Sequence, residues 1–108
     1  MKREIRVQRL NHVIAEAVQA FILPDATDDR LAQLEVAGVE LAGDLHNVTI
    51  HLVPGQGQEI LDPEELKEPL HRAEPWIREQ LMEHVSLKKA PVVHLSYIPL
   101  VRKRATNR

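Results

Sequence analysis

The stretch AEPWIREQL, residues 73–81, lies between two segments with helical spacing and carries a proline at position 75. A proline inside a helix has no backbone N–H to donate, and its ring clashes with the carbonyl four residues earlier, at a cost of about 3 kcal/mol. Pro75 must therefore either kink a helix or begin a new one. We predict a bend at Ala73, Glu74 and Pro75, with a third helix beginning at the proline.

Two helices are predicted before this bend. Apolar residues recur every three or four positions over residues 3–22, which predicts an amphipathic helix that ends just before Pro24. Further on, Asp62 precedes Pro63 and two acidic residues, which is typical of a helix start with a side-chain cap and a proline in the first turn. Pro69 then predicts either a distortion inside this second helix or a later start.

Three segments alternate between apolar and polar residues and predict strands. The first covers residues 33–41 and changes parity at Ala37-Gly38, which indicates a bulge or a strand covered on both faces. After a turn, residues 48–52 complete a hairpin, and residues 93–97 supply the last strand. The order helix, strand, strand, helix, kinked helix, strand predicts a two-layer α+β domain. It has a three-stranded sheet with helices on one face, and the last strand crosses over the helices to rejoin the hairpin.

Length and composition limit the classes of protein to which the chain can belong. The chain has 108 residues and no cysteine, and no apolar run approaches the roughly 20 residues that span a membrane. We predict a single domain over residues 1–99 and a disordered basic tail over residues 100–108. The lack of cysteine fits a reducing cytoplasm. We expect a monomer with no membrane and no small-molecule substrate as partner.

The net charge of −2 hides a strong asymmetry along the chain. Residues 1–9 and 88–108 together carry +9, and the residues between them carry −11. If both ends lie on one side of the fold, they form a basic face suited to a polyanion. The alternative is two solvated, partly frayed ends, and charge alone does not separate the two interpretations.

The residue pattern offers no catalytic or metal site. The six histidines are scattered over every predicted element without ligand spacing, and Asp25, Asp28 and Asp29 lack the glycine and closing glutamate of a calcium loop. Ser86 and Ser96 have no surrounding nucleophile motif, and no glycine-rich phosphate loop is present. We therefore predict that the chain is not an enzyme and binds no cofactor or metal.

The aromatic residues limit how the chain would bind nucleic acid. Phe21, Trp76 and Tyr97 are the only three, and Phe21 and Tyr97 fall in phase with apolar core positions. A platform for stacking bases is therefore not expected. Binding to RNA would rest on contacts between Lys or Arg side chains and phosphates.

Four segments resemble a known family, and the first is Arg6-Val7 in the first predicted helix. Residues 28–31 (DDRL), 36–45 (VAGVELAGDL) and 73–78 (AEPWIR) are similar to motifs of ribosome-binding factor A, with Pro75 where that family usually has glycine. Glycine and proline both interrupt a helix, so either residue can produce the bend. The resemblance covers nearly the whole chain and implies a KH type II-like domain in which the bend replaces the clamp loop of standard KH domains.

The resemblance also implies a function and its residues. It implies a factor that binds the small ribosomal subunit and its ribosomal RNA through phosphate and shape contacts, and that assists maturation and processing of this RNA. The bend at residues 73–75 and a set of basic side chains would then face the RNA. The basic residues of this prediction are Arg3, Arg6, Arg9, Arg78, Lys88, Lys89, Arg102, Lys103 and Arg104. The alternative is a KH-like protein-interaction module that uses its acidic face, with a small enzyme as a third hypothesis.

Overall fold

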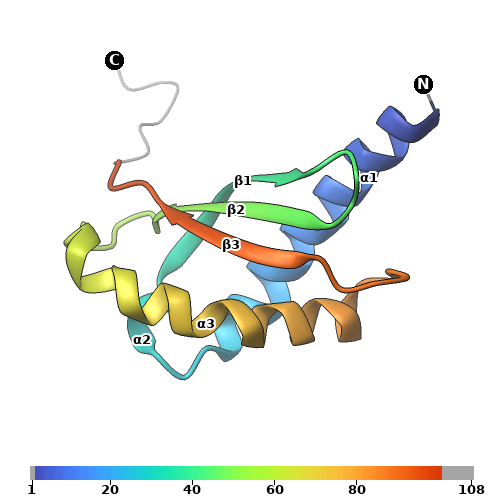
Figure 1. Cartoon of the computed structure of the whole chain (residues 1–108). Helices are drawn as coiled ribbons and strands as arrows, with labels where there is room; N and C mark the ends of the chain where they lie inside the picture. Colours follow the sequence, from blue (N-terminus) through green and yellow to red (C-terminus); the bar gives the residue numbers. More distant parts are fainter. Residues whose placement is uncertain (1, 101–108) are drawn as a thin grey trace, which may run out of the picture.

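The computed structural model describes residues 2–100, with side chains from residue 6 onward. The elements follow the predicted order except that one helix stands where two were predicted before the last strand, and that a short helix not predicted precedes the hairpin (Figure 1). Short turns of π and 3-10 helix follow the first helix. The elements are α1 (Lys2–Ala17), a π-helical turn (Val18–Ile22), a 3-10 turn (Leu23–Asp25), α2 (Asp29–Ala32), β1 (Leu34–Leu41), β2 (Asn47–Pro54), α3 (Pro63–His84) and β3 (Val92–Tyr97). No helix in this described part is long and apolar enough to cross a membrane.

The three strands form one sheet in the order β1-β2-β3. Strands β1 and β2 form an antiparallel hairpin, and β3 runs parallel to β2 after the crossover through α3. The register shifts between Val36 and Gly38, so that Ala37 is the extra residue of a β-bulge. The bulge confirms one of the two explanations offered for the change of parity in this strand.

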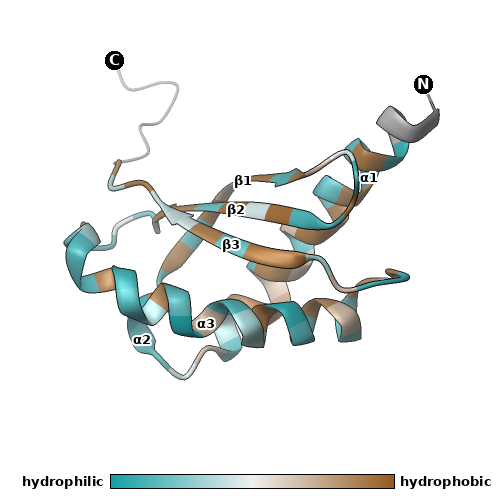
Figure 2. Ribbon diagram, in the orientation of Figure 1, coloured by the Kyte–Doolittle hydropathy of each residue, from teal (hydrophilic) through white to brown (hydrophobic). Residues whose placement is uncertain are grey.

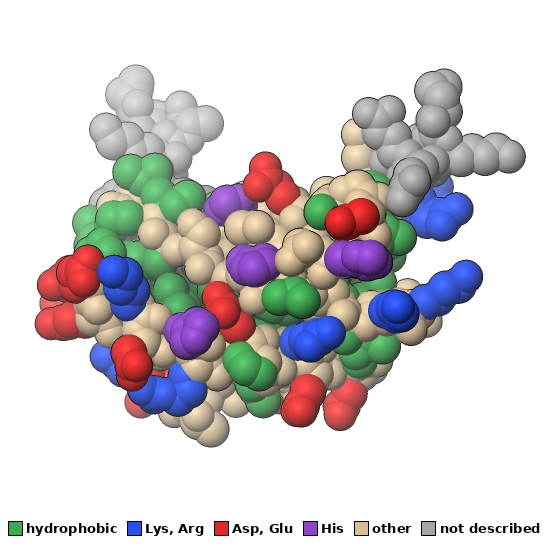
Figure 3. All heavy atoms as spheres, viewed as in Figure 1, with side chains coloured by type: hydrophobic (Ala, Val, Ile, Leu, Met, Phe, Trp, Pro, Cys, Tyr) green, Lys and Arg blue, Asp and Glu red, His purple; other side chains and the backbone are tan. Residues whose placement is uncertain are grey.

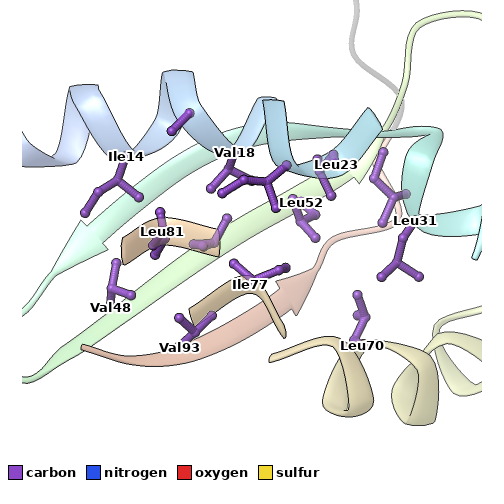
Figure 4. Close-up of a cluster of buried hydrophobic side chains, with 14 of the residues drawn as sticks. Ile14, Val18, Leu23, Leu31, Val48, Leu52, Leu70, Ile77, Leu81 and Val93 are labelled. Carbon is purple, nitrogen blue, oxygen red and sulfur yellow. The ribbon is translucent and has the colours of Figure 1, made fainter. Parts of the chain in front are cut away.

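The core lies between the sheet and the helices, which pack on one face of the sheet (Figures 1 and 4). Ile14 and Val18 reach it from the first helix, Val48 and Leu52 from β2, and Leu81 from α3 (Figure 4). Hydrophobic and hydrophilic residues alternate along the strands in Figure 2, as expected for a sheet with one covered face. The predicted two-layer α+β architecture is confirmed.

Phe21 is not a core residue, contrary to the prediction from its spacing. Its side chain is 57% exposed and stacks on the ring of His84, with the ring centroids 5.4 Å apart. The cause is the π-helical turn, in which the Leu23 N–H bonds to the carbonyl of Val18, five residues earlier. This wider turn places Ile22 and Leu23 in the core and turns Phe21 outward.

The predicted separate helix beginning at Pro75 is also wrong, because α3 continues from Pro63 to His84 through both Pro69 and Pro75. Packing explains why the helix continues. Leu66 and Leu70 before Pro75, and Ile77 and Leu81 after it, are all buried. Each such burial contributes about 1.5–3 kcal/mol, so the four together match or exceed the cost of about 3 kcal/mol for each of the two interior prolines. A bend of the helix axis at Ala73–Pro75 stays a prediction.

Helix side chains also accept hydrogen bonds from the two edge strands. On β1, the Val36 N–H donates to Oε1 of Gln19 over 2.7 Å, and the Leu41 N–H donates to Oδ1 of Asn11 over 2.8 Å. On β3, the Leu95 N–H donates to a carboxylate oxygen of α3, described below. These contacts occupy strand donors that would otherwise be open to another chain.

Candidate nucleic-acid interface

One end of the molecule collects segments that are far apart in the sequence. The start of α1, the β1–β2 turn and the loop after α3 meet there (Figure 1). Figure 3 shows Lys and Arg side chains at this right-hand end, with Asp and Glu side chains nearby, and another group of Lys and Arg side chains at the left-hand end. A cavity of about 430 Å³ lies between these segments. Arg6, Lys88 and Lys89 all line it, so the structure brings together three of the basic residues predicted to bind RNA.

The remaining polar groups at this cavity are Asp44, His46 and Ser86. The Asp44 carboxylate accepts a hydrogen bond of 2.9 Å from the backbone N–H of His46 and lies 4.0 Å from Nδ1 of the same residue. The acid is therefore engaged within its own turn, and the three cations of the lining outnumber it. The site favours an anion.

The β1–β2 turn that supplies part of this lining is held in an unusual conformation. Leu45 has φ 65°, the left-handed region, where a residue with a Cβ pays roughly 1–2 kcal/mol. Its N–H donates to the carbonyl of Ala42 over 2.8 Å, and the Val92 N–H donates to the carbonyl of His46 over 2.8 Å. These bonds hold the strained turn against the start of β3 and keep the Leu45 side chain in the cavity lining.

Arg78 lies next to this region without lining the cavity. Its guanidinium donates two hydrogen bonds to the carbonyl of Ala90, of 3.0 Å from Nη2 and 3.4 Å from Nε. Ala90 directly follows Lys88 and Lys89 in the chain. Arg78 therefore fixes the loop that presents these two lysines, and its own predicted contact with RNA stays a prediction.

The other predicted RNA-binding residues are not gathered at the cavity. Arg9 is exposed on α1 and is absent from the lining, and Arg3 lies on the part of α1 whose side chains are not described. Residues 102–104, which include the last three predicted cations, fall outside the described residues. Among the predicted cations whose side chains the structure describes, Arg6, Lys88 and Lys89 are the ones that line the cavity.

The predicted bend faces a different part of the molecule. Glu74 accepts a hydrogen bond of 2.9 Å from the Leu95 N–H, and its other oxygen lies 3.4 Å from Nδ1 of His71. A shallow hollow beside Pro75 is lined by the carboxylates of Glu74 and Glu79 and also by His71 and the predicted RNA-binding residue Arg78. No residue of 73–75 lines the basic cavity, and a shared RNA-binding surface of the bend and the basic ends stays a prediction.

The acidic loop near α2 has a structural role. Asp28 caps α2 by accepting from the backbone N–H of Arg30 over 2.9 Å, and the Arg30 guanidinium donates to both carboxylate oxygens. These hydrogen bonds lower the pKa of Asp28 below its usual value, and the bonds from the Arg30 side chain contribute most. In the described part of the chain no three acidic or histidine side chains are grouped to hold a metal ion.

A two-layer α+β domain with a β-hairpin, a crossover helix and a third parallel strand defines the KH type II-like class of protein. The ribosome-binding factor A family matches residues 6–98. The chain belongs to this family.

Individual relatives agree with this assignment. Ribosome-binding factor A of Azotobacter vinelandii is 30% identical over 99 residues, covering 91% of this chain and 77% of the relative. The Limosilactobacillus fermentum protein of the same name is 29% identical over 91 residues, covering 84% of this chain and 75% of the relative.

Solved structures show the same fold. The crystal structure of ribosome-binding factor A from Thermus thermophilus is similar with a TM-score of 0.64 at 20% identity, covering 88% of this chain and 93% of the other. A homology model of the Thermus thermophilus factor, fitted into a cryo-electron microscopy map of its complex with 30S, gives a TM-score of 0.54 at 26% identity. That comparison covers 85% of this chain and 88% of the other.

Proposed function

We propose that this protein is an assembly factor of the small ribosomal subunit, which binds ribosomal RNA at the basic end of the molecule and assists its maturation and processing. The relatives are named for ribosome binding, and one of them is placed in a complex with 30S. The observation that carries the proposal is the meeting of Arg6 with Lys88 and Lys89 around one cavity, from opposite ends of the chain.

Phosphate contacts are the proposed source of affinity. Each Lys or Arg that neutralises a phosphate releases counterions, so binding weakens as the salt concentration rises. The protein would act as a monomer in the cytoplasm, and its contribution is binding rather than catalysis. Arg78 supports the site by holding the carbonyl of Ala90 and with it the loop of Lys88 and Lys89.

Co-sedimentation with immature small subunits tests this proposal. We expect binding at ~50 mM salt, where phosphate contacts are strong, and a steep loss toward ~200 mM. Combined replacement Arg6→Glu, Lys88→Glu and Lys89→Glu should abolish binding. The control Lys67→Glu/Arg72→Glu reverses two charges on the exposed surface of α3, outside the cavity lining, and should bind as the parent does.

Two results would contradict the proposal. The first is that the parent protein fails to sediment with subunits at the lower salt. The second is that the triple charge reversal leaves sedimentation unchanged, which would favour a protein-interaction module that uses other surfaces. A maturation role is measured separately, as accumulation of small-subunit RNA with unprocessed ends in cells that lack the protein.

A further inference from the structure

The cavity at the basic end has a feature that phosphate binding does not explain. Besides the cations, its lining is formed largely by aliphatic side chains. These are Leu10, Leu41, Leu45, Leu87 and Pro91. A phosphate group needs cations and hydrogen-bond donors and gains nothing from apolar lining residues. The lining therefore fits a ligand with an apolar part as well as negative charge.

The backbone strain at Leu45 is a second, independent observation at the same place. A leucine with φ 65° is a rare outlier, since glycine and asparagine adopt this region far more readily. Strained residues of this kind cluster at binding sites, where the surrounding structure holds them in place. Here the strain places an aliphatic side chain in the lining, where asparagine would relieve the strain and remove the apolar surface.

We propose that this cavity holds the base of one unpaired nucleotide of the RNA, an inference that rests on the proposed function. The flat faces of the base lie on the leucines, and the phosphates on either side of the nucleotide contact Arg6, Lys88 and Lys89. A volume of about 430 Å³ falls within the usual range of small-ligand pockets. Ser86 supplies a polar group at the same cavity for the edge of the base.

The charge of the site favours RNA over a protein segment as occupant. Three cations and one carboxylate line the cavity, and that carboxylate is bonded within its own turn. An unpaired nucleotide brings a charged phosphate on each side of a base with flat, weakly polar faces, which matches a lining of cations and aliphatic side chains. Paired bases in a regular duplex cannot enter, so the site selects bulges, loops and single strands.

Two RNA hairpins that differ in one base provide the test. Each carries a single-nucleotide bulge, which is intact in one hairpin and abasic in the other, so the number of phosphates is the same. Fluorescence anisotropy at ~50 mM salt measures both affinities. We expect the parent protein to bind the intact bulge about 10-fold more tightly, the effect expected of one well-packed base.

Three variants assign this preference to the cavity. Leu45→Asn introduces a residue that tolerates the left-handed conformation of the turn. It should lower the ratio of the affinities for the intact and abasic hairpins from about 10 to about 1, without weakening binding to the abasic hairpin. Lys88→Gln/Lys89→Gln should weaken binding to both hairpins and leave the ratio of the two affinities unchanged. Ile60→Asn changes an exposed apolar residue outside the lining, in the loop between β2 and α3, and should leave both affinities unchanged.

The possible failures are distinguishable. If the parent binds both hairpins with equal affinity, the nucleotide assignment is overturned and the proposed function stands. If neither hairpin binds at this salt concentration, the nucleotide assignment and the proposed function are both contradicted. A third outcome is that the parent binds both hairpins equally, whereas the Leu45→Asn variant no longer co-sediments with small subunits. The cavity then accepts a protein segment, and the nucleotide assignment is wrong. A preference that persists in Leu45→Asn, with an unchanged melting temperature, also overturns it.

Discussion

Replacing Lys88 and Lys89 by glutamine removes two of the three cations that line the cavity and leaves Arg6 in place. For single-stranded RNA, the logarithm of the binding constant falls with the logarithm of salt concentration by about 0.7 per phosphate contact. Three contacts give a slope of about −2, so affinity should fall roughly 20-fold between ~50 and ~200 mM salt. One contact gives a slope of about −0.7 and a loss of only about 3-fold.

Anisotropy titrations with a labelled single-stranded RNA over this salt range measure both slopes. The matched control is Lys67→Gln/Arg72→Gln, which removes the same charge from α3. These two side chains form exposed pairs with Glu64 and Glu68, which contribute little to stability, and they lie outside the cavity lining. A slope that stays near −2 in the Lys88/Lys89 variant, or that flattens equally in the control, would refute the assignment of the cavity as the phosphate-binding site.

Three further predictions concern the scaffold that carries the site. Glu74→Ala leaves the Leu95 N–H without its acceptor and should cost about 1–3 kcal/mol of unfolding free energy in urea titrations, and an unchanged midpoint would argue against the contact. Gly55→Ala introduces a Cβ that collides with the carbonyl of Gln33, so thermal melting should show a clear loss of stability, and a parent-like melting temperature would show that the loop adjusts freely. Because the pKa of Asp28 is lowered in the folded protein, its charged form stabilises the fold above pH ~4, and this contribution is lost on further acidification. The free energy of unfolding of Asp28→Asn should therefore depend less on pH below pH ~4 than that of the parent. Parallel pH profiles of the two proteins would contradict this.

Local patterns predicted most of the architecture, because the signals for it are short in range. Alternation located the strands, and the change of parity at Ala37-Gly38 marked the bulge. The helix start at Asp62 was predicted from its cap, and the carboxylate does accept from the Glu64 N–H over 3.0 Å. Three strands and helices on one face then left few topologies to consider.

The errors arose where tertiary packing overrides a local rule. Spacing placed Phe21 in the core, but a π-helical turn shifts the phase of the last residues of that helical segment. The proline rule predicted a new helix at Pro75, but burial of Ile77 and Leu81 holds one helix together. Neither the π-helical turn nor the continuation of the helix through Pro75 can be recognised from a few neighbouring residues of the sequence.

The candidate site could be predicted only in part. Counting charges pointed to the two basic ends of the chain, and the family resemblance implied Arg6, Lys88 and Lys89 within a set of nine basic residues. The cavity between them was not predicted, because it depends on how the β1–β2 turn packs against α1 and the loop after α3. The left-handed Leu45 was also missed, since leucine gives no sign of a conformation that usually selects glycine or asparagine.

Photo-crosslinking on immature small subunits tests the central claim most directly, that the basic end of this molecule lies on ribosomal RNA. A photoreactive amino acid in place of Ser86, which lines the cavity, is compared with the same replacement at Ile60 in the loop between β2 and α3. We predict a crosslink to ribosomal RNA from position 86 and none from position 60. A crosslink from position 60 alone, or from neither position while the protein sediments with the subunit, would contradict the claim.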